Sequence, residues 1–293
     1  MNNKLIAQPR PLYPDLIPNS KKTANEEHVE GGDGPTMIKK ISLPTIQYFA
    51  PSVPNATGSA VIIFPGGGYS SNAITHEGTD IAKKFNEIGV AAFVVKYRIP
   101  DDKTMPDKEI GPLQDAQQAI KVVREKAADY NISPQQIGIM GFSAGGHLAS
   151  TAGTHFKESK IPNEKKTNLR PDFMILVYPV ISFQDDIAHQ GSRSQLLGKS
   201  PSPQKKEIYS NELQITPETP PTFLVHASDD EVVVPANSIR FYENLLKNNV
   251  KAELHIYQGG GHGFGLNNET TNDEWFLSCR NWMETNGWLS MSK

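Results

Sequence analysis

Hydrophobic and polar positions follow two patterns along the chain. Short, almost wholly apolar runs, which are typical of buried parallel strands, cover residues 60–64, 90–95, 137–142, 173–177 and 220–227. Residues 37–49 and 250–257 alternate apolar and polar positions, and Pro44 marks the first of these stretches as an edge strand. Apolar residues at helical spacing predict helices over residues 77–88, 112–130, 235–248 and 273–282.

Strands that alternate with helices predict a mostly parallel central sheet with helices on both of its faces. We expect residues 37–293 to form a single domain of this kind. Residues 1–36 are rich in proline, asparagine, glycine and lysine and show no periodicity, so we expect an extended arm laid over the domain. The polar stretch 180–220 is too long for a plain connection and predicts a small cap or a wall beside a site.

The apolar run 137–142 leads into Gly141-Phe142-Ser143-Ala144-Gly145, and a small-residue stretch of helical character follows. The pattern G-x-S-x-G between a strand and a helix is the nucleophile elbow of α/β-hydrolases, so it predicts that fold, with Ser143 as the nucleophile. Gly141 and Gly145 leave room for the sharp turn. The amide of Ala144 would lie in the first helical turn, where it can hold an oxyanion. The alternative is a tight turn with an incidental serine.

A catalytic serine needs a base, and the base needs an acid to hold it. In this fold the acid and then the histidine follow the serine along the chain. His262 lies between glycines in a loop after the last predicted strand and is the candidate base, the alternative being a plain loop histidine. Asp229, Asp230 and Glu231 follow the strand at 220–227. Only one of them can face the histidine, and we select Asp230; the other two are expected to be solvated or to cap the next helix.

Three glycines follow the strand at 60–64, and Gly67 and Gly68 are the candidates for the second part of an oxyanion hole. A phosphate-binding loop is a competing interpretation, but Tyr69-Ser70-Ser71 occupies the place of its Lys-[Ser/Thr] pair. Tyr69 is the candidate substrate-binding residue, because it would narrow the acyl side of the pocket. The His, Cys and Asp residues show no metal-site spacing, so we expect neither a metal nor a cofactor.

Composition and charge limit the remaining classes. The 293-residue chain has 37% hydrophobic and 21% charged residues, a net charge of −3 and a pI near 6.3. These values predict a globular protein that binds neither nucleic acid nor an anionic membrane. The single cysteine, Cys279, excludes an internal disulfide and is expected to be a small buried residue. The sequence as it stands indicates a cytoplasmic protein, or a periplasmic or secreted one if a signal peptide was removed.

Several blocks of the sequence resemble bacterial α/β-hydrolase esterases related to acetyl xylan esterases and bifunctional feruloyl/acetyl esterases. Together they cover most of residues 60–265: Phe64 to Tyr69, His76-Glu77-Gly78, Val95 to Arg98, Leu113 to Ala116, Gly141 to His147, Leu196-Leu197-Gly198, Thr219 to His226 and Gly260 to Phe264. Hormone-sensitive lipases match less well, because Pro65 replaces their H-G-G-G histidine. Dienelactone hydrolases use a cysteine where this chain has Ser143. The resemblance implies Ser143 as nucleophile, Asp230 as acid and His262 as base, with Gly67 or Gly68 and Ala144 as oxyanion donors.

The sequence therefore predicts a serine carboxylesterase that removes acetyl or other short acyl groups, on xylan-type carbohydrate in particular, without a cofactor. A serine peptidase or amidase on the same triad, a feruloyl esterase and a carbohydrate-binding protein with a vestigial site are the alternatives. Some members of the resembling group are labelled xylanases, but the sequence shows no paired-carboxylate glycosidase site. The polar residues of 180–220 favour contacts with sugar hydroxyls over a lipase-like acyl pocket, the alternative being a surface wall without substrate contact. The oligomeric state is left open.

Overall fold

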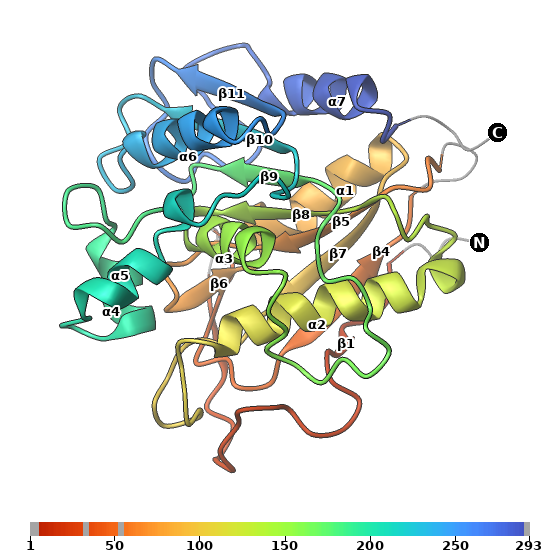
Figure 1. The fold of residues 1–293 in the computed structure, drawn as a ribbon. Helices are drawn as coiled ribbons and strands as arrows, with labels where there is room; N and C mark the ends of the chain where they lie inside the picture. Colours follow the sequence, from red (N-terminus) through yellow and green to blue (C-terminus); the bar gives the residue numbers. More distant parts are fainter. Residues whose placement is uncertain (1–5, 32–34, 52–55, 290–293) are drawn as a thin grey trace.

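The computed structural model describes residues 6–31, 35–51 and 56–289. One large sheet has the strand order β1-β4-β7-β5-β8-β9-β10-β11, and a small sheet has the order β2-β3-β6 (Figure 1). The strands are β1 (Arg10–Pro11), β2 (His28–Glu30), β3 (Met37–Lys39), β4 (Thr45–Phe49), β5 (Ala60–Phe64), β6 (Ser71–Ala73), β7 (Ala91–Lys96), β8 (Ile137–Phe142), β9 (Met174–Val177), β10 (Thr222–Ala227) and β11 (Ala252–Tyr257).

The helices include five of eight or more residues that flank the large sheet. These are α1 (Asp80–Glu87), α2 (Gly111–Glu125), α3 (Ser143–Thr154), α6 (Ala236–Lys247) and α7 (Trp275–Thr285). The remaining helical segments are η1 (Thr75–Thr79), η2 (Ala127–Tyr130), α4 (Gln190–Leu197), α5 (Pro203–Ile208) and η3 (Asn211–Leu213). Among the described residues, no helix is both long and apolar enough to cross a membrane.

The strands from β7 to β11 in this order run parallel, and β4 and β1 complete the sheet antiparallel. All five residues of β5 are buried, because the strand lies in mid-sheet between β7 and β8 with helices over both faces. Residues of α2, α3 and α6 belong to one apolar cluster, and residues of α1 and α7 belong to the cluster on the other face (Figure 1). The predicted α/β-hydrolase fold class is confirmed.

Three predicted elements are divided in the structure. The stretch 37–49 forms two strands on either side of Pro44, one in each sheet. The helix expected at 77–88 begins with a π-helical turn, in which the Thr79 amide bonds the Ile74 carbonyl at 2.9 Å and Glu77 faces the interior. The helix expected at 112–130 ends at Glu125, and a 3₁₀ turn follows.

The N-terminal arm is anchored to the domain by a strand and a buried ion pair. β1 pairs with β4, and Leu12 and Tyr13 are buried directly after it. The Tyr13 hydroxyl donates to Asp115 Oδ1 at 3.0 Å, and Arg98 Nη1 donates to the Pro18 carbonyl at 2.8 Å. Arg98 and Asp115 themselves pair at 2.8 Å, with side-chain exposures of 1% and 0%. The arm therefore covers a buried charge pair, and removing either partner of such a pair would be costly.

Candidate active site

The nucleophile elbow lies where β8 ends and α3 begins. Ser143 is the first residue of α3 and has a φ of 49°, a left-handed value that an L-residue adopts only under constraint. A Cβ on Gly141 would lie 2.1 Å from the Gly145 carbonyl oxygen, and one on Gly145 would lie 2.1 Å from the Phe64 carbonyl oxygen. The turn therefore closes only with glycine at both positions, as the sequence pattern predicts.

The three predicted triad residues meet at the carboxyl ends of β8, β10 and β11. His262 Nε2 is 2.9 Å from Ser143 Oγ, and His262 Nδ1 is 2.7 Å from Asp230 Oδ2. The His262 side chain is 17% exposed and that of Asp230 is fully buried, so solvent reaches the base but not the acid. This arrangement can move a proton from the serine to the histidine while the carboxylate holds Nδ1–H.

The structure separates the three acidic candidates after β10. Asp230 is the one within hydrogen-bonding distance of His262. Asp229 is exposed and accepts hydrogen bonds from the amides of Gly260 and Gly261 at 3.2 and 2.8 Å, so it holds the loop that carries the histidine. Glu231 is exposed. The other two acids were expected to be solvated or to cap the following helix, and Asp229 does not cap it.

Asp230 is held ionised by its hydrogen bonds. Burial raises the pKa of this carboxyl group, but hydrogen bonds from His226, His262 and the Val233 amide outweigh burial and hold the pKa well below its usual range. His226 Nε2 is 3.2 Å from Asp230 Oδ2 and donates to the Val233 carbonyl at 2.8 Å. This contact of His226 with the acid was not predicted from the sequence; the available signal was that His226 lies near the end of β10, the strand that Asp230 follows.

The amides of Gly67, Gly68 and Ala144 are available for an oxyanion. The Gly66 carbonyl accepts from the Ala73 amide at 3.0 Å, and the Gly67 carbonyl accepts from the Ser70 and Ser71 amides at 2.9 and 3.1 Å. Because the carbonyl and amide of a trans peptide point in opposite directions, these bonds turn the amides of Gly67 and Gly68 away from the turn. Neither amide has an acceptor within the described part of the chain. Ala144 lies in the first turn of α3, where amides lack intrahelical partners.

Tyr69 is buried rather than exposed to the cleft. Its side chain is 1% exposed, and its hydroxyl is 2.9 Å from His147 Nδ1. The ring lies edge-on to Tyr97 and to His147, with centroid separations of 6.3 and 5.7 Å. A direct contact between this side chain and an acyl group stays a prediction, and the structure shows the Tyr69 side chain packed against Tyr97 and His147.

One residue of the 180–220 segment lies beside the oxyanion turn. His189 caps the N-terminus of α4, with Nδ1 accepting from the Ser192 amide at 3.3 Å. A Cβ on Gly68 would lie 3.9 Å from His189 Cε1. Burial and the neighbouring His262 lower the pKa of His189, so the neutral ring is favoured and Nε2 carries its proton. His189 therefore brings a hydrogen-bond donor close to the oxyanion turn.

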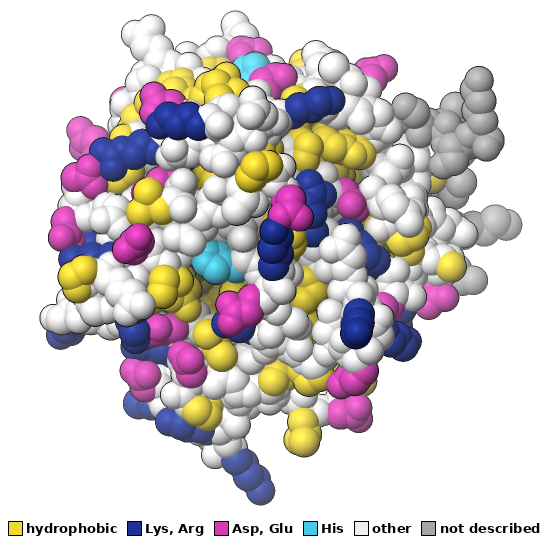
Figure 2. Space-filling model, in the orientation of Figure 1, with side chains coloured by type: hydrophobic (Ala, Val, Ile, Leu, Met, Phe, Trp, Pro, Cys, Tyr) yellow, Lys and Arg dark blue, Asp and Glu magenta, His cyan; other side chains and the backbone are white. Residues whose placement is uncertain are grey.

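Most other polar groups of this segment are used within it. The Ser182 hydroxyl donates to Glu212 at 2.6 Å, and Arg193 donates to the Phe183 carbonyl at 2.8 Å and to Asp185 at 2.7 Å. On the face drawn in Figure 2, acidic and basic side chains are interspersed. The segment is thus a wall stabilised by its own contacts, from which His189 reaches toward the site.

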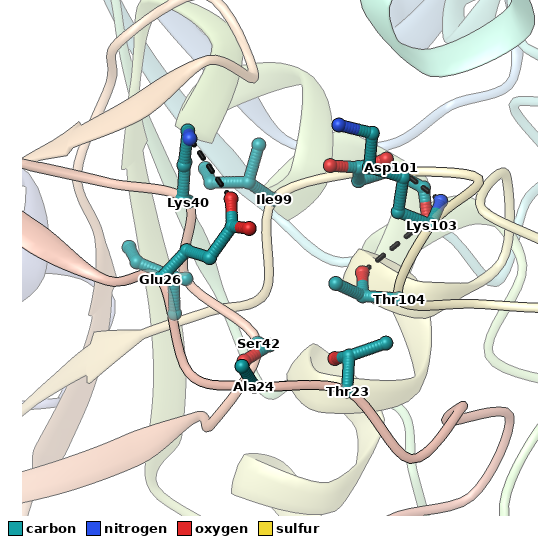
Figure 3. Close-up of a pocket in the computed structure, with 10 residues that line it drawn as sticks. Thr23, Ala24, Glu26, Lys40, Ser42, Ile99, Asp101, Lys103 and Thr104 are labelled. Atoms are coloured by element: carbon teal, nitrogen blue, oxygen red, sulfur yellow. Dashed lines mark hydrogen bonds and ion pairs between the residues drawn. The ribbon is translucent and has the colours of Figure 1, made fainter.

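A separate pocket of about 110 Å³ lies between the arm and the loop after β7 (Figure 3). It is lined by parts of segments 23–26, 40–42 and 99–104, and the Lys40–Glu26 ion pair, 2.9 Å long, spans its wall. No triad residue lines this pocket. Across residues 6–31, 35–51 and 56–289, no group of three or more His, Cys, Asp or Glu side chains is placed to hold a metal ion.

The elbow, the hydrogen-bonded Ser143, His262 and Asp230, and the parallel sheet together define an α/β-hydrolase with a serine triad. The BD-FAE family model matches residues 46–245, and the chain belongs to this family. The dienelactone hydrolase family model matches residues 202–292. The resemblance to bacterial esterases of the acetyl xylan and feruloyl/acetyl type is confirmed.

This chain matches three similar proteins over different shares of their length. Acetylxylan esterase of Xylanibacter ruminicola is 38% identical over 79% of this chain and 46% of its own. Endo-1,4-beta-xylanase B of Butyrivibrio fibrisolvens is 34% identical over 74% of this chain and 33% of its own. The chain thus spans less than half the length of both curated relatives. The crystal structure of an acetyl ester-xyloside bifunctional hydrolase from Caldicellulosiruptor lactoaceticus is 37% identical, with a TM-score of 0.82 over 96% of this chain and 97% of that one.

Proposed function

We propose that this chain is a serine carboxylesterase that removes acetyl or other short acyl groups from xylan-type carbohydrate. The observation that carries the proposal is the unbroken hydrogen-bonded row from Ser143 Oγ through His262 to Asp230, with bonds of 2.9 and 2.7 Å. Such a row lowers the cost of forming the alkoxide that attacks an ester carbonyl.

The reaction follows from the positions of these groups. Ser143 Oγ attacks the carbonyl carbon while His262 Nε2 takes the hydroxyl proton, and Asp230 stabilises the resulting imidazolium. We assign to the amides of Gly67, Gly68 and Ala144 the role of donating to the oxygen that becomes negative. When the tetrahedral species collapses, the sugar oxygen leaves with the proton from His262, and an acyl-serine remains. Water then repeats the sequence and releases the carboxylic acid.

Two observations support carbohydrate as the leaving group. Two of the similar proteins carry names that include acetylxylan and acetyl ester-xyloside substrates. His189 places a hydrogen-bond donor beside the oxyanion turn, and such a donor suits a sugar hydroxyl better than a long acyl chain. An acyl pocket of the lipase kind needs broad apolar walls, because each buried methylene contributes about 0.8 kcal/mol.

The test is the hydrolysis of acetyl, butyryl, octanoyl and feruloyl esters, together with acetylated xylo-oligosaccharides, by wild type and by Ser143→Ala. We expect kcat/KM to fall from acetyl to butyryl to octanoyl, and acetylated xylo-oligosaccharides to exceed simple alkyl acetates. A maximum at octanoyl would contradict the carbohydrate-ester assignment while leaving the esterase chemistry in place. Matched acetyl amides, assayed beside the esters, separate an esterase from an amidase or peptidase.

A further inference from the structure

Glu77 is a buried carboxylate that the proposed reaction does not use. It lies in the π-helical turn Thr75–Thr79 and is 4% exposed. No lysine or arginine pairs with it among the described residues; the His76 ring nitrogen Nε2 is 3.7 Å away. A buried carboxylate is costly unless its oxygens accept hydrogen bonds, and π-helical turns are frequent at functional sites.

The two oxygens of Glu77 accept from two different parts of the site. Oε2 accepts from the amide of Gly66, the residue directly before the oxyanion glycines, at 2.8 Å. Oε1 accepts from the Tyr178 hydroxyl at 2.8 Å, and that hydroxyl in turn accepts from the Gly265 amide at 3.0 Å. Gly265 lies in the loop that carries His262. One carboxylate thus joins the oxyanion turn to the histidine loop.

Both ends of this link reach the reacting groups. A Cβ on Gly66 would lie 2.6 Å from Glu77 Oε2 and 3.0 Å from Ser143 Cβ, so the Gly66 backbone is the spacer between the carboxylate and the nucleophile. At the other end, the Tyr178 ring lies 5.0 Å from the His262 ring in an edge-on arrangement. We propose that Glu77 is a positioning residue, which holds the oxyanion turn and the loop of His262 at the distance that catalysis requires. This inference rests on the proposed esterase function.

The direction of the hydrogen bonds explains why the residue is a carboxylate. The amides of Gly66 and Gly265 can only donate. Tyr178 therefore accepts from Gly265 and donates its own hydrogen bond to Glu77, and Glu77 accepts two hydrogen bonds. Burial, reinforced by the charge of Glu77, raises the pKa of Tyr178 well above its usual value, so the phenol keeps that proton. A glutamine has one acceptor oxygen and would turn its NH₂ group toward either the Gly66 amide or the Tyr178 hydroxyl. With NH₂ toward Gly66, two donors face each other; with NH₂ toward Tyr178, that hydroxyl has to accept twice and its own proton has no acceptor. Either orientation leaves one buried donor of the link without an acceptor, although the side chain keeps its size.

The experiment compares Glu77→Gln, Tyr178→Phe and the double variant with wild type. It measures kcat and KM for 4-nitrophenyl acetate, the affinity for phenylboronic acid, which forms a tetrahedral adduct with a catalytic serine, and Tm. We expect Glu77→Gln to lower kcat about 10- to 100-fold while KM changes less than about threefold, because the turn holds the charge of the transition state and not the substrate. Boronate affinity should fall in parallel with kcat. The double variant should lose little more than the worse single one, since both changes break the same link.

Asp172→Asn is the matched control. Asp172 Oδ2 accepts from the Ile137 amide at 2.8 Å, at the start of β8 and therefore at the end of that strand opposite Ser143. We expect this variant to lower Tm and to keep wild-type kcat and boronate affinity. Wild-type kcat and boronate affinity in Glu77→Gln, or fully additive losses in the double variant, would overturn the inference alone. A wild type that neither hydrolyses esters nor reacts with a fluorophosphonate at Ser143 would overturn the proposed function, and the inference with it.

Discussion

At the scale of single residues, the nucleophile gives the most direct prediction. Ser143→Ala should lower kcat for acetyl esters by at least about three orders of magnitude, because triad members act as a unit and the histidine then has no proton to take. Removing one hydroxyl from a turn shaped by Gly141 and Gly145 should leave the melting temperature within a few degrees of wild type. Retention of most of the activity by a purified, folded variant would rule out Ser143 as the nucleophile.

Asp230 can be tested against its immediate neighbour. Asp230→Asn should lower kcat by about two to four orders of magnitude, because the amide no longer enforces the Nδ1–H tautomer of His262. Glu231 is exposed and adjacent, so Glu231→Gln is the matched control and should keep wild-type kinetics. Steady-state kinetics on one acetyl ester suffice for the comparison. If Glu231→Gln were the damaging change, the acid would be misplaced by one residue.

At the scale of elements, helix α3 carries a pH-dependent contribution to stability. His147, one turn after the nucleophile, is fully buried; its Nε2 donates to the Tyr209 carbonyl at 2.9 Å, and its ring stacks on Phe183. Burial lowers the pKa of His147 to about 4, whereas an unfolded histidine has a pKa of about 6.5. Between these values the unfolded chain binds more protons than the folded protein, so the free energy of unfolding falls as the pH falls.

The contribution of His147 can be isolated by comparing wild type with His147→Gln. The stability difference between the two should shrink by up to about 3 kcal/mol from pH 7.5 to pH 4, because the wild type alone loses this contribution. Urea unfolding at several pH values measures it, and titrations shared by both proteins cancel. A difference that stays constant over this range would mean that the buried imidazole does not govern the pH response of the helix.

The elements also show where sequence patterns stop being informative. The central strands were predictable because a strand buried on both faces must be apolar throughout, as β5 is. The π-helical turn before α1 was not predictable. Its buried Glu77 is held by hydrogen bonds from Gly66 and Tyr178, and these two residues lie far apart in the sequence. The one indication in the sequence that Glu77 matters was its position in the block His76-Glu77-Gly78, which resembles the esterase family.

At the scale of the whole molecule, the candidate site follows from topology more than from any single motif. Ser143, Asp230 and His262 each follow a parallel strand, so all three lie at the same edge of the sheet. Their order along the chain was therefore enough to predict that they meet. The sequence could not show that His189 approaches the oxyanion turn or that Tyr69 faces inward, since both depend on how the 180–220 wall and the glycine turn pack. Motifs formed by neighbouring residues can be predicted from the sequence, whereas contacts between side chains far apart in the chain cannot.

The N-terminal arm provides a test at this same scale. Leu12 and Tyr13 are buried, and Tyr13 and the Pro18 carbonyl bond to the buried Arg98–Asp115 pair from the solvent side. A chain that begins at Lys22 loses two buried side chains, each contributing about 1.5–3 kcal/mol. It also loses the hydrogen bonds that Tyr13 and the Pro18 carbonyl make with the pair. We expect its Tm to fall by about 5–10 °C.

A chain that begins at Ile6 is the control for this truncation, because it keeps β1 and every arm contact described above. The arm supplies no triad or oxyanion group. Below its own melting temperature, the chain from Lys22 should therefore hydrolyse acetyl esters with a kcat close to that of the control. Thermal unfolding and steady-state kinetics of the two truncations decide the matter. If the shorter chain kept the full Tm, the arm would cover the domain without stabilising it. If the shorter chain kept its fold but lost kcat, the arm would act on the site itself.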